Sequence, residues 1–155
     1  MAAALCWVVM PEQSVTGALA LFAAGALLVR LARWKAWSIA REPLLLALFL
    51  GYGWVVISFA LQGASVLGGH VQEAQVVHAI GAGAVGGMTL IVMMRAILGH
   101  ANHPIVGNRW DVVILTAVHL GAVLRVLAPW ASDEFATVQV AGILWASGFA
   151  VFVLR

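Results

Sequence analysis

Long apolar runs alternate with short polar breaks along the chain. A transmembrane helix needs about 20 predominantly apolar residues to cross the hydrocarbon core. Five runs meet this need, and they predict spans at about 15–31, 43–61, 75–98, 110–128 and 135–154. Together with their loops they use nearly all of residues 1–155, so we expect an all-α, polytopic transmembrane helix bundle that forms a single domain.

The first ten residues form a shorter apolar run. As a helix they would reach only about 15 Å, so we expect an N-terminal half-helix and not a span. It resembles the tail of a span whose beginning is missing, and we expect a fragment or a short form of a longer protein. Ser14 follows a polar break and is predicted to cap the next helix. Pro43 is predicted to lie in the first turn of the second span.

The composition agrees with a chain surrounded by lipid. Hydrophobic residues make up 64% of the chain and charged residues only 9%, against roughly 25% charged in a soluble domain. The net charge of +2 provides no patch for nucleic acid, so we expect the lipid bilayer as the surrounding partner. Cys6 is the one cysteine, which excludes an intrachain disulfide.

The charged residues predict the orientation in the membrane. If the spans alternate, most of the cations fall on one side, with Trp34 and Trp37 among them: Arg30, Arg33, Lys35, Arg41, Arg95, Arg109 and Arg155. The opposite loops carry Glu12, Glu73, Asp133 and Glu134. By the positive-inside rule, the 30–42 and 99–109 loops are predicted to be cytoplasmic.

Arg125 is the remaining cation, and it lies inside the fourth predicted span, near its outer end. A charge at the centre of a span costs roughly 2.5–3.5 kcal/mol, and less near the end. Two interpretations remain open. Arg125 extends outward to the headgroups, or it pairs with a carboxylate or a ligand anion.

The histidines lie at different depths. His70 is in an outer loop, His78 in the outer part of the third span and His119 near the middle of the fourth, whereas His100 and His103 are at the cytoplasmic end. His78 and His100 are roughly 33 Å apart along one helix, so they cannot share a metal ion. His78 and Arg125 lie at similar depth, so they are candidates to hold one cofactor, with Arg125 facing an anionic group such as a haem propionate.

His100 and His103 would share a helical face if the helix continues that far, and such spacing suits metal ligation. Gly83 and Gly87 have the GxxxG spacing of packed transmembrane helices. The small residues around them would alternatively leave room beside His78 for a flat macrocycle. Three methionines are either soft copper ligands or packing residues: Met88, Met93 and Met94.

Three separated motifs resemble the NnrS family in the family's order. Residues 78–100 read HAIGAGAVGGMTLIVMMRAILGH, residues 33–54 contain RWKAW and REPLLLALFLGYGW, and residues 122–129 read AVLRVLAP. The resemblance covers nearly the whole chain. It corresponds to the C-terminal part, or a short form, of longer family members.

This resemblance implies a bacterial inner-membrane protein that contains haem and copper and contributes to tolerance of nitric oxide. The residues that match the family pattern are His78, Met88, Thr89, Arg95, His100 and Arg125. Two positions depart from the family pattern, which has a histidine at Phe49 and a basic residue at His103. If the missing histidine is a ligand, either the chain binds less metal or His119 or His103 substitutes for it. The candidate cofactor residues are therefore His78, His119 and Arg125, and the candidate metal ligands are His78, His100 and His103.

We expect a haem-binding and copper-binding membrane protein with nitric oxide as its ligand, and whether it is an enzyme stays open. One alternative is a transport or channel subunit with a polar path along His78, His119 and Arg125. Another is a non-catalytic fragment that needs partner helices or forms a homo-oligomer.

Overall fold

The fold is described by a computed structural model that covers residues 1–35, 39 and 41–154. The predicted Trp37 and Arg155 therefore lie outside the described residues. The elements run in this order: α1 (Ala2–Val9), α2 (Ser14–Ala32), α4 (Pro43–Val66), α5 (Glu73–His78), the π-helix η1 (Ala79–Gly86), α6 (Gly87–His100), α7 (Arg109–Leu127), the 3₁₀-helix η2 (Ala128–Trp130) and α8 (Glu134–Leu154). No strand occurs among these described residues, which confirms the all-α prediction.

Five helical stretches are long and apolar enough to cross a membrane, as predicted. They are α2, α4, the continuous α5–η1–α6 unit, α7 with η2, and α8. The predicted bounds agree with these stretches to within a few residues, except that α4 continues past residue 61 to Val66. Pro43 does lie in the first turn of α4.

The N-terminal run forms the short helix α1, as expected, and it packs against α2. The capping prediction for Ser14 is wrong, because Ser14 is already the first residue of α2 and no side chain caps this end. Thr16 ties the turn together instead, since its hydroxyl donates to the carbonyl of Met10 at 2.6 Å.

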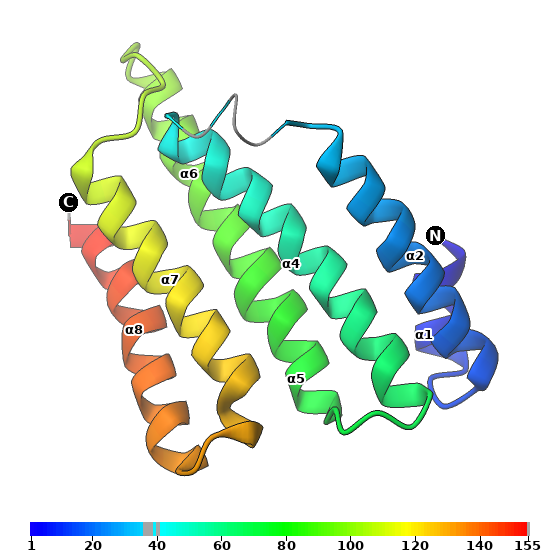
Figure 1. The fold of residues 1–155 in the computed structure, drawn as a ribbon. Helices are drawn as coiled ribbons and strands as arrows, with labels where there is room; N and C mark the ends of the chain where they lie inside the picture. Colours follow the sequence, from blue (N-terminus) through cyan, green and yellow to red (C-terminus); the bar gives the residue numbers. More distant parts are fainter. Residues whose placement is uncertain (36–38, 40, 155) are drawn as a thin grey trace.

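The third span is the central helix of the molecule (Figure 1). It contacts α4 on one side and α7 on the other, while α2 packs on α4 and α8 packs on α7. Part of this central helix is a π-helix, which begins directly after His78 and ends before Gly87. Such wide turns are rare and frequently occur at functional sites.

The charged residues of the connections lie at the two ends of the bundle, and the orientation in the membrane stays a prediction. The end of α2, the start of α4 and the α6–α7 connection lie at one end of the molecule, and the α4–α5 and α7–α8 connections lie at the other (Figure 1). The described cations of the predicted cytoplasmic loops therefore share one end of the bundle, opposite the Glu73 and Glu134 helix starts.

Candidate functional site

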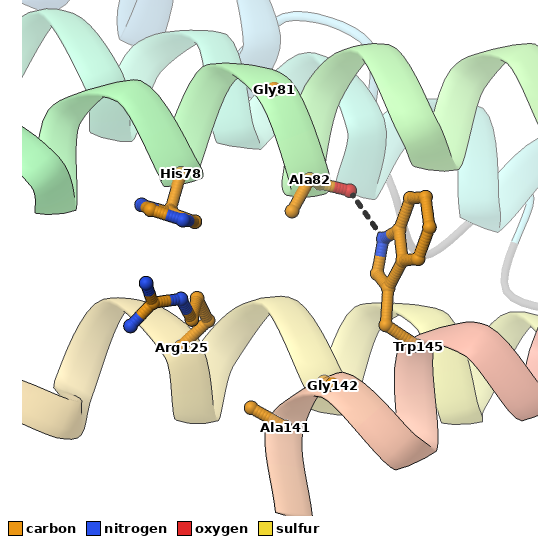
Figure 2. Close-up of a pocket in the computed structure, with 8 residues that line it drawn as sticks. His78, Gly81, Ala82, Arg125, Ala141, Gly142 and Trp145 are labelled. Carbon is orange, nitrogen blue, oxygen red and sulfur yellow. Dashed lines mark hydrogen bonds between the residues drawn. The ribbon is translucent and has the colours of Figure 1, made fainter. Parts of the chain in front are cut away.

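His78 and Arg125 face each other across a cavity of about 360 Å³ (Figure 2). His78 is the last residue of α5, and Arg125 lies near the end of α7. Further residues of η1, α7 and α8 complete the lining: Gly81, Ala82, Gly121, Ala141, Gly142 and Trp145. The structure thus brings together two of the predicted cofactor residues, at the similar depth that their positions in the sequence indicated.

One ring nitrogen of His78 is held by its own helix. Nδ1 is hydrogen-bonded to the carbonyl of Ala74, one turn earlier. A carbonyl oxygen only accepts, so the proton must sit on Nδ1. In the neutral ring, Nε2 therefore keeps its lone pair. This is the arrangement found in metal-bound histidines, where a hydrogen bond to the second nitrogen fixes the tautomer and the ring orientation.

The Arg125 guanidinium lies opposite the His78 ring (Figure 2). Its side chain is half-buried. Within the described part of the chain, no carboxylate forms an ion pair with it. Both interpretations of Arg125 therefore stay open: extension to the headgroups, and pairing with a carboxylate or a ligand anion.

Gln75 links α5 to α7 by a hydrogen bond beside this site. Its side-chain amide donates to the carbonyl of Val126 at 2.7 Å, and its Oε1 accepts from the backbone N–H of Gln72 at 2.9 Å. The side chain is fully buried. Val126 follows Arg125 directly, so this bond fixes the helix that carries His78 against the helix that carries Arg125. We did not predict this role, although an amide inside an apolar span was the available signal.

Trp145 of α8 closes another side of the cavity. Its indole N–H donates to the carbonyl of Ala82 at 3.2 Å, which ties α8 to η1 (Figure 2). Gly81 and Gly142 leave open space, since a Cβ at either position would meet no atom within 4 Å. The prediction of small residues beside His78 thus has a structural counterpart at Gly81.

The other glycines of the third span receive aromatic rings of neighbouring helices. A Cβ at Gly83 would lie 2.3 Å from the Trp54 ring, one at Gly86 would lie 2.9 Å from the Trp145 ring, and one at Gly87 would lie 2.8 Å from the His119 ring. The GxxxG pair therefore serves helix packing. Its glycines contact aromatic side-chain rings, whereas close contact between helix backbones was expected.

His119 lies apart from His78 and Arg125. It lines a separate groove of about 510 Å³ between α4 and α7, and this groove shares no lining residue with the His78 cavity in the part of the chain that the structure describes. The indole N–H of Trp54 donates to Nδ1 of His119 at 3.1 Å. An indole only donates, so the neutral ring carries its proton on Nε2. That nitrogen is buried without a partner among the described residues, and its proton makes it a donor and not a metal ligand.

His100 and His103 do not share a helical face. A shared face requires the helix to continue to His103. Instead, α6 ends at His100, and Asn102 adopts a left-handed conformation with φ of 54°. Both histidines are exposed. Among residues 1–35, 39 and 41–154, no three His, Cys, Asp or Glu side chains gather in a metal-binding group. Copper binding stays a prediction.

The methionines divide between packing and a surface groove. Met94 is buried in the core, and Met88 packs against Gly51, where an added Cβ would lie 2.5 Å from its side chain. Met93 lies beside His100 in a groove that Phe152 also lines. Packing therefore accounts for Met88 and Met94.

The comparison with known families covers the chain from end to end. The family model described as "NnrS protein" matches residues 1–155. The chain belongs to the NnrS family. The motif that carries this NnrS likeness, residues 78–100, is the central helix from the end of α5 through η1 and α6. Neither the curated proteins nor the solved structures searched contain a match.

Proposed function

We propose that this NnrS-family protein binds haem through His78 and contributes to nitric-oxide tolerance in a bacterial membrane. The observation that carries the proposal is the His78 ring itself. Its Nδ1–H donates to the Ala74 carbonyl, and the lone pair of Nε2 is left free beside the cavity. This donor chemistry fits an iron porphyrin held by a single imidazole nitrogen.

The chain's own residues supply what such a group needs. The Ala74 carbonyl fixes the tautomer and the orientation of the His78 ring. Gly81 leaves space next to the ring, and the Trp145 indole covers the neighbouring wall. When bound, haem would supply an iron centre that binds nitric oxide, with its affinity tuned by the pocket.

The proposal is confined to haem. Copper stays a prediction, and so do the metal ligands predicted at His78, His100 and His103. A transport path would need His78, His119 and Arg125 in one line. His119 instead lines the groove between α4 and α7 and is bonded to Trp54, so the geometry gives that alternative no support.

Survival under nitric-oxide stress tests the proposed role. The chain is expressed in a bacterium that lacks its own NnrS protein, and growth is followed after addition of a nitric-oxide donor. We expect the wild type to shorten the growth delay and His78→Ala to lose this protection. His70→Ala is the matched control, since His70 is an exposed loop histidine that does not line the cavity. Equal protection by both variants, at equal amounts in the membrane, would contradict the proposal.

A further inference from the structure

Arg125 is a charged group in an apolar setting that needs a counter-ion. It lies within a membrane-spanning helix, and no carboxylate of the described residues neutralises it. A charge at such a position is costly unless it is paired. The cavity in front of the guanidinium is where a partner has room.

The surroundings define the charge of that partner. Apart from Arg125 and His78, the described lining consists of glycines, alanines and Trp145. The Trp145 N–H is already used by Ala82, and the Nδ1 proton of His78 is used by Ala74. Arg125 therefore faces the cavity with unused donors and one positive charge, which matches a singly charged anion.

The shape of the guanidinium defines the geometry of that anion. Its planar fork pairs with two oxygens at once, and such bidentate, charge-assisted pairs are the strong ones. Apolar walls weaken screening and strengthen the attraction. Gly81 and Gly142 leave the space unfilled, so no side chain of theirs competes for it.

We propose that Arg125 makes this cavity a binding site for a planar anion with two oxygens, of the carboxylate or nitrite type. The anion has two sources. It is a carboxylate carried by a bound cofactor, such as a haem propionate, or it is a small free anion. The cofactor source rests on the proposed haem function, whereas the free-anion source does not.

The first arm of the test uses protein free of haem in detergent. Thermal unfolding is followed while sodium nitrite or sodium acetate replaces sodium chloride at constant ionic strength. If the anion is free, both salts raise the midpoint of wild type at low concentration. Arg125→Gln then needs an anion concentration at least about tenfold higher for the same rise in the midpoint, as expected when a hydrogen-bonded charge is lost. Arg109→Gln, which changes an exposed cation on the same helix, behaves as wild type.

The second arm uses haem as the probe. Absorption titrations compare haem with its dimethyl ester, which lacks the propionate charges, in wild type, Arg125→Gln and Arg125→Lys. If a propionate occupies the site, wild type prefers haem by about tenfold. Arg125→Gln then removes that preference, and Arg125→Lys keeps part of it because it retains the charge without the fork.

The outcomes separate the two proposals. Dependence on Arg125 in either arm supports the anion site and identifies its source. Failure of every variant to bind haem defeats the haem proposal, and the salt arm then decides the anion site alone. Equal responses of wild type and Arg125→Gln in both arms overturn the anion site.

Discussion

At the residue scale, the two intramembrane histidines have opposite proton positions. The Ala74 carbonyl fixes the proton of His78 on Nδ1, whereas the Trp54 indole leaves the proton of His119 on Nε2. The sequence made both residues candidates for a cofactor, because intramembrane histidines are rare. It could not show which nitrogen is free, since this depends on a carbonyl four residues earlier in one case and on a distant helix in the other.

The Trp54–His119 bond gives a stability prediction. Trp54→Phe keeps an aromatic ring against Gly83 but removes the donor to His119. The unpaired nitrogen should cost about 1–3 kcal/mol, measured by thermal unfolding in detergent. Trp110→Phe changes an exposed ring and should leave the unfolding midpoint unchanged within error. A similar loss in both variants would mean that this hydrogen bond contributes nothing.

At the element scale, the third span was predictable in extent but not in form. Its apolar run and its flanking polar residues placed the bounds well. The π-helix could not be predicted, because a run of glycine and alanine has no side-chain pattern that distinguishes its hydrogen bonding from that of an α-helix. The same run hid which glycines face rings and which face open space.

Two glycines of η1 therefore provide a matched pair. Gly83→Ala places a methyl group into the Trp54 ring and should destabilise the protein by about 1–3 kcal/mol through overpacking. Gly81→Ala adds the same group in open space and should be neutral, or stabilising by up to about 1 kcal/mol through helix propensity. Unfolding midpoints of the two variants test this difference. If Gly81→Ala were as harmful as Gly83→Ala, the described packing of Trp54 would be wrong.

At the scale of the whole molecule, the number and order of spans followed from the sequence. Lipid tolerates only segments whose backbone is hydrogen-bonded internally, so apolar length is a strong signal. Which side of each helix is buried could not be predicted from the sequence. These helices are apolar nearly all round, and such a helix has no polar side that marks its buried face. For that reason the sequence grouped His119 with His78 and Arg125, whereas the fold turns it toward α4.

The predicted orientation in the membrane can be tested by labelling. In a Cys6→Ala background, His70→Cys places a thiol in the α4–α5 connection and Asn102→Cys places one in the α6–α7 connection. These two connections lie at opposite ends of the bundle (Figure 1). An impermeant maleimide added to cells with a permeabilised outer membrane should label His70→Cys. It should label Asn102→Cys only after the inner membrane is opened. The reverse pattern would show that the 99–109 loop is not cytoplasmic.

The central claim is that His78 holds haem in the cavity beside η1. The most direct measurement is the absorption spectrum, oxidised and reduced, of protein purified in detergent after expression with ample haem, with iron analysis alongside. We expect a Soret band that shifts on reduction, persists in His70→Ala and is lost in His78→Ala. A featureless, iron-free spectrum of the wild type, or a Soret band unchanged in His78→Ala, would contradict it.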